Sequence, residues 1–512
     1  MNHYFCAIDA GTGSIRAVIF DTHGHQCAMA QYEWTHIAEV GVEGSMGFDF
    51  SQGWLLAKRC IQEAIAKAGI SAQEIRAISA SSMREGIVVY DKDKKELWGV
   101  ANVDSRASCE VAQLKHQSPT MELEFYKSSG QTFALSAAPR LLWLKNNHPF
   151  MYEKATYFTM ISDWILFKLS GELATESSNA GTAGAFNLKT RDWEKSQFEQ
   201  CGLKDLFVPV LESGDVLGKI SAQASEETGL SRDTLVVMGG GDVQIGTAGL
   251  GACKLGDAVI LGGSFWQQVV NIPSDKALCD EMLLRVNPHV VRGMSQAEGI
   301  TFFTGLVMRW FRDTLGGGRS YEELEKMAAS IPVGSYGILP IFSDSMNYGE
   351  WIHASPSFIG LGLDSSKYNI GSLFRSLEEN ACIVSGINLD NIKAFSGVSP
   401  TSLTFASGAS NGAVWSQILA DVTGLVVNVP VVKEATALGV AMACGIGAGV
   451  YSSFEEAGAN IVKIERSYEP NTANFQTYQE IKERWRKVYS KQMELVRDGT
   501  LEPMWKAPGV FE

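Results

Sequence analysis

The sequence predicts an α/β protein of two domains, each built on a mixed β-sheet. Short β-like runs at residues 4–8, 15–20 and 25–34 precede a helical pattern at 51–69, and another β-like run follows at 75–81. The 512-residue chain is too long for one ordinary core, so two domains of roughly 200 to 250 residues are expected. A second run-turn-run pattern at 257–272 resembles the first hairpin and indicates a duplicated unit.

The elements follow one another in a β-β-β-α-β order at the start of the chain. The helix is expected to begin at a capping Ser51 and to end at Gly69, because hydroxyl residues and glycine favour these two positions. This order fits a mixed sheet with a helix packed on it, and it does not fit a simple βαβ nucleotide-binding unit.

Segments rich in glycine and other small residues separate the predicted elements in the rest of the chain. A strand is expected to run into three glycines and Asp242 within 236–251, and such small residues suit a crossing point between domains because they let backbones approach closely. A strand, a turn and a helix are predicted at 405–424, and a helix of small residues at 433–449. The predicted boundaries are 1–246 for the first domain, 247–455 for the second, and 456–512 for a helical tail packed on the second.

Composition excludes several classes of protein. The net charge of -14 and the lack of a long basic cluster argue against nucleic-acid and anionic-membrane partners. The nine cysteines are scattered, without a C-x-x-C pair, which predicts free thiols in a reducing compartment and no zinc site. No targeting segment and no apolar run of about 18 residues is seen, so a cytoplasmic protein is expected.

An aspartate, Asp9, lies between two apolar runs and just before a Gly-Thr-Gly-Ser turn. The turn is no dinucleotide fingerprint, because Arg16 replaces its third glycine, and the chain has no P-loop motif. The backbone N–H groups of Thr12, Gly13 and Ser14 can face phosphate oxygens, with Asp9 beside them to hold a hydrated Mg²⁺. Alternatively, Asp9 only caps the turn.

Four separated motifs resemble, in order, those of the FGGY carbohydrate kinases. They are D-x-G-T-x-S-x-R from Asp9, GGGDVQIG at 239–246, a second glycine hairpin at 262–264, and a G-A-S-N turn at 408–411 before a WSQILAD helix. The resemblance covers nearly the whole chain. It implies two actin-like, RNase H-like domains with ATP and Mg²⁺ in the cleft between them.

The resemblance also implies roles for particular residues. Asp242 would be the general base and an acceptor contact, and the SSMREG segment would give Arg84 and Glu85 as further acceptor contacts. The nucleotide would be bound by Thr12, Gly13, Ser14, Arg16, Gly262, Gly263, Ser264, Gly305, Gly408, Ala409 and Asn411, and Asp9 would hold the metal through water. Trp266 is expected to be a packing residue by its type, yet its place beside the second hairpin also makes it a candidate wall of the acceptor pocket.

The sequence departs from the family pattern at three places. Asn102 stands where the family has tryptophan, Glu176 stands where aspartate is usual, and 406–408 reads Ala-Ser-Gly in place of Asp-Gly-Gly. The nucleotide contacts near 406 are therefore left open.

The acceptor is less well defined than the chemistry. Further segments narrow the resemblance to a kinase of a small linear dihydroxylated dione, and 132–143 lacks the aromatic hydroxyl that glycerol kinases offer there. A pentulose or glycerol kinase is the alternative, and an actin-like or heat-shock-like ATP switch is the remote one. The Arg84–Glu85 pair with Asp242 favours a kinase, because a switch needs no base for a substrate hydroxyl. Related kinases are regulated by a phosphocarrier protein of the sugar phosphotransferase system, and this partner and the oligomeric state stay open.

Overall fold

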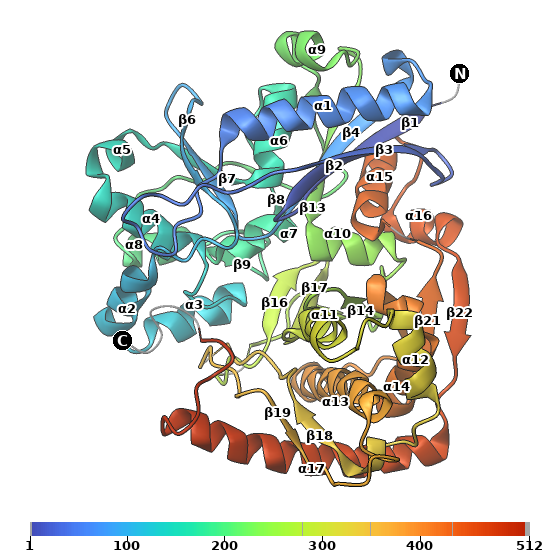
Figure 1. Cartoon of the computed structure of the whole chain (residues 1–512). Helices are drawn as coiled ribbons and strands as arrows, with labels where there is room; N and C mark the ends of the chain where they lie inside the picture. Colours follow the sequence, from blue (N-terminus) through green and yellow to red (C-terminus); the bar gives the residue numbers. More distant parts are fainter. Residues whose placement is uncertain (1–2, 279, 349, 433, 507–512) are drawn as a thin grey trace.

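The computed structural model describes residues 3–278, 280–348, 350–432 and 434–506. It has two halves, each with a central sheet, drawn one above the other in Figure 1. Blue-to-green elements make up most of the upper half and yellow-to-red elements most of the lower half.

The first sheet has six strands, and β1 lies inside it. β1 pairs with β2 in an antiparallel and with β4 in a parallel manner, and β13 continues the parallel part. All but the first residue of β1 are buried, as expected for a strand covered on both faces. In spatial order the strands are β12 (Val216–Lys219), β13 (Leu235–Gly241), β4 (Ile75–Ser82), β1 (Tyr4–Ala10), β2 (Ser14–Asp21) and β3 (Gln26–Glu33).

The second sheet repeats this pattern with seven strands. β14 pairs antiparallel with β15 and parallel with β20, and β21 continues the parallel part. An antiparallel edge strand closes the parallel side of both sheets, β12 in the first and β22 in the second. The predicted duplication is therefore confirmed at the level of topology. The order is β16 (Arg285–Pro288), β17 (Met294–Thr301), β15 (Trp266–Pro273), β14 (Ala258–Gly262), β20 (Ser402–Ala406), β21 (Val426–Pro430) and β22 (Ile464–Tyr468).

A smaller sheet and most of the short helices lie at the side of the first sheet. The three-stranded sheet has the order β6 (Glu96–Val100), β5 (Ile87–Tyr90) and β7 (Tyr157–Met160). Helices of the N-terminal half are α1 (Phe50–Ala68), α2 (Ser108–Gln117), α3 (Met121–Ser129), α4 (Ala137–Asn147), α5 (Pro149–Lys154), α6 (Ile161–Ser170), α7 (Ser177–Ala180), α8 (Lys195–Gln200), α9 (Ala222–Thr228) and α10 (Asp242–Gly249). Helices of the C-terminal half are α11 (Thr304–Thr314), α12 (Tyr321–Ala329), α13 (Ile370–Ser396), α14 (Ala413–Thr423), α15 (Ala435–Gly447), α16 (Phe454–Ile461) and α17 (Thr472–Arg497).

The first helix begins earlier than the sequence pattern indicates. The cap of α1 is Asp49, whose carboxylate accepts a hydrogen bond from the N–H of Gln52, so the predicted Ser51 cap is wrong. The predicted end is confirmed, because Gly69 adopts a left-handed conformation with a φ of 67°.

Helices α10 and α15 cross with their backbones in contact. A Cβ on Gly249 would lie 2.1 Å from the carbonyl oxygen of Ala435, and one on Gly439 would lie 2.0 Å from that of Ile245. The close approach that the small residues predict is thus confirmed. It places α15 against β1, β4 and β13 of the first sheet, although α15 comes late in the chain.

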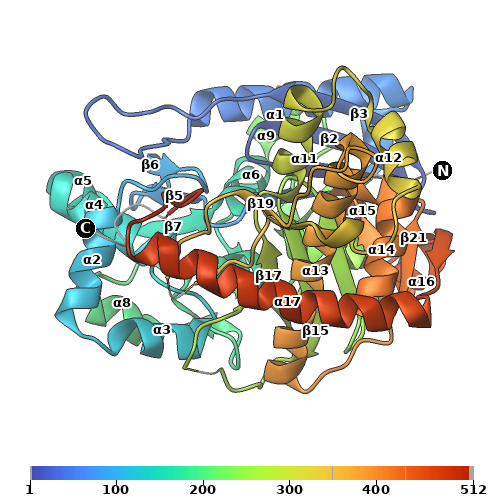
Figure 2. The ribbon, with the colours of Figure 1, turned by 60° about the horizontal axis from the view of Figure 1, so that its bottom comes forward.

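The predicted boundaries can be compared with where elements lie. The boundary at 246–247 falls inside α10, and the one at 455–456 falls inside α16. The tail contains β22 as well as α17, and α17 packs on α13 and α14 through Tyr478 and Trp485, which join the core of the C-terminal half. Figure 2 shows α17 running along this half.

Within the described part of the chain, every helix is too short or too polar to span a bilayer. The eight cysteines described by the structure are all free thiols.

Candidate active site

Asp242 is the first residue of α10, directly after the three glycines that end β13. These glycines are required by space, since a Cβ on Gly239 would lie 1.9 Å from the carbonyl oxygen of Ala80 in β4. The N–H of Val243 donates to Oδ1 of Asp242 over 2.8 Å, so the carboxylate is fixed at the positive end of the helix. The capping residue itself is Gly241.

The surroundings of Asp242 suit a proton acceptor. Burial between the two halves raises its pKa to about 6, although 36% of the side-chain surface stays accessible. Nε of Arg84 lies 3.6 Å from Oδ1 and lowers this pKa, whereas the negative charges of Glu85 and Asp9 raise it. The group is therefore ionised at neutral pH yet more basic than an ordinary aspartate.

Arg84 and Glu85 are buried, and each is paired with the C-terminal half. Arg84 donates from Nη1 and Nη2 to Glu298 on β17, over 2.7 and 3.0 Å. Oε1 of Glu85 accepts from Nη2 of Arg285 on β16 over 2.6 Å. Only 7% of the surface of Arg84 and 8% of that of Glu85 are exposed, so the two residues are not a solvent-exposed ion pair at a strand end.

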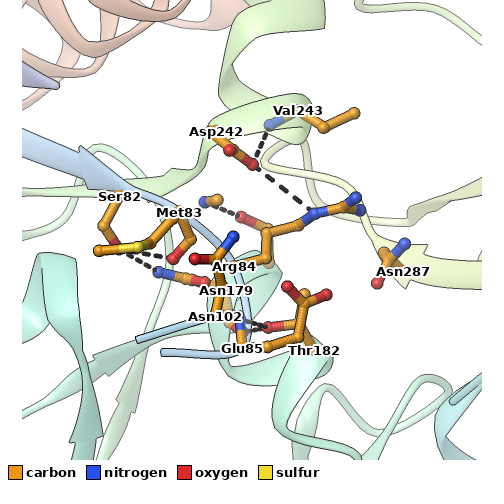
Figure 3. Close-up of polar contacts among 12 residues, drawn as sticks. Ser82, Met83, Arg84, Glu85, Asn102, Asn179, Thr182, Asp242, Val243 and Asn287 are labelled. Atoms are coloured by element: carbon orange, nitrogen blue, oxygen red, sulfur yellow. Dashed lines mark hydrogen bonds and ion pairs between the residues drawn. The ribbon is translucent and has the colours of Figure 1, made fainter. Parts of the chain in front are cut away.

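The backbone of Glu85 is held in a strained conformation. Its φ is 63°, in the left-handed region that costs a side-chain-bearing residue of order 1 kcal/mol or more. Its N–H donates to Oγ1 of Thr182 over 3.2 Å, and its carbonyl oxygen accepts from Arg140. Burial acts to raise the pKa of Glu85, but Arg285 and Arg84 outweigh it and hold that pKa below its usual value. Figure 3 shows Arg84 pointing toward Asp242, with Glu85 close by.

Asn102 connects this cluster to the first glycine turn. Its Nδ2 donates to Oγ1 of Thr12 over 3.0 Å, and its backbone oxygen accepts from Nη2 of Arg140. The residue that replaces the family's tryptophan thus lies between the Arg84–Glu85 cluster and the turn expected to bind phosphate.

At that turn, Asp9 is 4% exposed and paired with Arg16 on the neighbouring strand. Nε and Nη2 of Arg16 each lie 2.9 Å from Oδ2 of Asp9, and Nη1 lies 2.6 Å from Glu434. Burial raises the pKa of Asp9, and Arg16 offsets part of that rise. No cluster of three or more His, Cys, Asp or Glu side chains fit for a metal exists among the described residues. One carboxylate beside a phosphate turn still fits Mg²⁺, which keeps several waters and takes its remaining ligands from nucleotide phosphates.

A cavity of about 460 Å³ lies in the C-terminal half and gathers most of the predicted nucleotide residues. It brings together Gly262, Gly263, Ser264, Gly305, Gly408 and Ala409. Thr12, Gly13, Ser14 and Arg16 do not line it, because they belong to the β1–β2 turn and to the start of β2 in the other half. Asn411 also lies outside the lining, exposed at the end of the 3₁₀ turn 408–411.

Two of these glycines are required by close packing. A Cβ on Gly305 would lie 2.4 Å from the carbonyl oxygen of Gly263, and one on Gly262 would lie 2.8 Å from Cβ of Ala409. Larger residues would push the second hairpin and the 408–411 turn out of place.

Trp266 does not join the acceptor cluster. It is fully buried, with ring centroids 5.0 Å from Phe405 and 4.8 Å from Trp415, and it lines the nucleotide-side cavity. The packing expected from its residue type is confirmed. The structure places the side chain in the core of the second sheet and in the lining of the nucleotide-side cavity, and its acceptor contact stays a prediction.

Sequence reasoning missed Arg140, Arg285 and Glu298, although all three hold the Arg84–Glu85 pair. Glu298 left a signal, since it is a lone acidic residue inside a fully buried part of β17. Arg140 and Arg285 left no signal in the pattern. The reason is that their partners are backbone carbonyls or side chains of the other half.

Comparison with known proteins shows the same family over both halves of the chain. Residues 4–249 match the N-terminal domain of the FGGY family of carbohydrate kinases, and residues 274–448 match its C-terminal domain. Autoinducer-2 kinase of Salmonella paratyphi B is 53% identical and that of Escherichia coli K12 is 51% identical, each over 99% of this chain and 98% of the relative.

Solved structures share the fold at low sequence identity. Xylulose kinase from Rhodospirillum rubrum has a TM-score of 0.86 at 21% identity, covering 97% of this chain and 100% of that one. Plasmodium falciparum glycerol kinase with ADP has a TM-score of 0.84 at 15% identity, covering 96% and 98%. The predicted two-domain α/β fold is confirmed.

Proposed function

Since the chain belongs to the FGGY family of carbohydrate kinases, we propose that this ATP-dependent kinase phosphorylates autoinducer-2. The acceptor would be the linear form, (S)-4,5-dihydroxypentane-2,3-dione, and the reaction would place the phosphate on its primary C5 hydroxyl. The observation that carries the proposal is identity above 50% to autoinducer-2 kinases over 99% of the chain. The product would be the phosphorylated quorum-sensing signal.

The chemistry follows from the position of Asp242. Its carboxylate takes the proton of the C5 hydroxyl while that oxygen forms a bond to the γ-phosphorus of ATP. The bond from this phosphorus to the bridging oxygen breaks, and ADP leaves with that oxygen. Base action of this kind contributes about 10²- to 10⁴-fold to the rate.

The other residues of the site would orient the acceptor and neutralise the charge of the phosphates. Glu85 and the charged groups around it would orient the acceptor's oxygens, and the N–H groups of the two glycine turns would hold the phosphates. Mg²⁺ bound near Asp9 would neutralise phosphate charge. Arg16 offsets part of the rise that burial causes in the pKa of Asp9.

One assay separates this proposal from its two alternatives, a kinase for a pentulose or glycerol and an ATP-driven switch protein. We would couple ADP release to NADH oxidation and compare dihydroxypentanedione, xylulose, ribulose and glycerol as acceptors. Preference for the dione by kcat/KM supports the proposal, whereas comparable turnover on all four, or none on the dione, refutes it. ATP hydrolysis that no acceptor stimulates would favour a switch protein.

The base is tested by Asp242→Asn. This variant keeps the shape and the hydrogen bond from Val243 but cannot accept the proton at neutral pH. Its kcat should fall at least about 10²-fold, with ATP affinity by calorimetry little changed. A wild-type rate would show that another group is the base.

The kinase is further proposed to act in the cytoplasm and to bind a phosphocarrier protein of the sugar phosphotransferase system. The free thiols of the eight described cysteines support a reducing compartment. The phosphocarrier rests on the family resemblance alone, and its binding would be measured by calorimetry with the purified pair.

A further inference from the structure

We propose that Tyr348, contributed by the C-terminal half, binds the acceptor through its phenolic hydroxyl and helps to select a dione. This inference rests on the proposed function and adds to it a residue that recognises the acceptor. The motifs of the sequence do not include it.

Tyr348 lies in the segment between β18 (Leu339–Ile341) and β19 (Ser357–Ile359). It forms a buried cluster with Met346 and Trp351, and Ala134 and Leu135 of the N-terminal half pack against this cluster. The N–H of Met346 donates to the carbonyl oxygen of Ile300 over 2.9 Å, which fastens the segment to β17. The same strand carries Glu298, the partner of Arg84.

The hydroxyl of Tyr348 is buried without a hydrogen-bond partner among the described residues. The residue is 4% exposed. A polar group buried in this way costs roughly 1 to 3 kcal/mol, and a ligand that restores the missing bond recovers that cost. A buried hydroxyl without a partner near the proposed acceptor site is therefore a candidate for a hydrogen bond to the ligand.

The charges that act on this hydroxyl are those of the acceptor cluster. Burial raises the pKa of Tyr348, Glu298 and Glu85 raise it further, and Arg285 and Arg84 lower it. These four residues form two of the ion pairs between the halves, Arg84–Glu298 and Glu85–Arg285. Tyr348 thus completes a group whose other members already face the expected acceptor position.

The hydrogen-bond inventory explains why such a donor is needed. The two carbonyl oxygens of a dione can only accept, and the ionised carboxylates of Glu85 and Asp242 can only accept as well. Each terminal nitrogen of Arg84 uses one of its two N–H bonds on Glu298, and the Nε of Arg84 lies 3.6 Å from Asp242, so carboxylates already hold much of this guanidinium. The hydroxyl of Tyr348 is neutral and has a proton that it can donate to a carbonyl oxygen of the dione.

The geometry also accounts for the apolar wall at 132–143. Glycerol kinases, by the family resemblance, have an aromatic hydroxyl near that wall, and here Ala134 and Leu135 pack against the Tyr348 cluster. An aromatic hydroxyl is supplied from the opposite half instead. The contact to the acceptor then forms only when the two halves lie together as in this structure.

The test is Tyr348→Phe, which removes one oxygen and keeps the ring. The KM for the dione should rise roughly 3- to 10-fold, as expected for loss of one neutral hydrogen bond, with the KM for ATP unchanged. Because the deleted oxygen has no hydrogen-bond partner in the part of the chain that the structure describes, the melting temperature should hold or rise slightly. Tyr90→Phe is the matched control, since its hydroxyl is fully buried beside Thr159 in the first half and it should leave both KM values unchanged.

The outcomes separate this inference from the proposed function. If the wild type prefers the dione and Tyr348→Phe has an unchanged KM, Tyr348 does not bind the acceptor. A marked loss of melting temperature in Tyr348→Phe would show that the protein itself uses the hydroxyl, which also overturns the inference. If the wild type prefers another sugar and the variant raises the KM for that sugar, the dione assignment fails and the role of Tyr348 in binding stands.

Discussion

Gly439→Ala tests how tightly the crossing of α10 and α15 holds Asp242, the proposed base. The new Cβ would lie 2.0 Å from the carbonyl oxygen of Ile245, and ordinary contacts begin at 3.4 Å, so the helices must separate by 3.4 minus 2.0, or about 1.4 Å. Alanine gains up to about 1 kcal/mol of helix propensity over glycine, whereas overpacking costs about 1 to 3 kcal/mol and sometimes more. We expect a net loss of roughly 1 to 2 kcal/mol.

The assay combines stability with turnover. A loss of that size lowers the melting temperature by roughly 2 to 8 °C. Because α10 begins at Asp242, a displacement of about 1 Å should also lower kcat by about 10- to 100-fold. Gly218→Ala is the control, since the nearest atom to its Cβ is 3.8 Å away, and it should change neither quantity. A Gly439→Ala enzyme with wild-type melting temperature and kcat would refute the argument that this crossing positions the base.

Three further predictions follow from the site. The kcat/KM for the acceptor should fall as pH drops through about 6, because the pKa of Asp242 is raised from 3.8 and protonation removes the base; an acid limb near pH 4 would contradict this. Gly305→Ala should raise the KM for ATP roughly tenfold and spare that of the acceptor, since its Cβ would lie 2.4 Å from the oxygen of Gly263; equal KM values would refute it. Glu298→Ala should lower the free energy of unfolding by about 3 kcal/mol in urea titrations, because it leaves Arg84 buried without that partner, and an unchanged midpoint would count against a buried pair.

Local patterns in the sequence predicted much of the fold. The hairpin at 257–272 and the strand, turn and helix at 405–424 are found as β14–β15 and as β20, the 3₁₀ turn and α14. Such features depend on nearby residues, namely β-like runs bounded by glycine turns. The glycines around Asp242 also predicted the close crossing, because only glycine allows backbones to approach so far.

The rest depends on contacts between distant residues. Arg84 lies 214 residues from Glu298, and Glu85 lies 200 residues from Arg285, so their pairing follows from the register of β16 and β17 and from the docking of the two halves. No local signal marks Tyr348 either. The same limit applies to Trp266: its place beside the hairpin indicated a pocket wall, but only the packing of the second sheet shows that this wall belongs to the nucleotide-side cavity.

The ion pairs Arg84–Glu298 and Glu85–Arg285 would affect both the entry of the acceptor and the release of the product. Arg285 and Glu298 are directly opposite in the β16–β17 register. Arg285 pairs with Glu85 and Glu298 pairs with Arg84, so this square of side chains carries two positive and two negative charges. The square sums to zero, so an uncharged acceptor enters without electrostatic penalty. Transfer leaves about two negative charges on the product, beside Asp242 and with no net positive charge in the square to hold them. The same neutral surroundings that admit the acceptor therefore favour departure of the phosphorylated product.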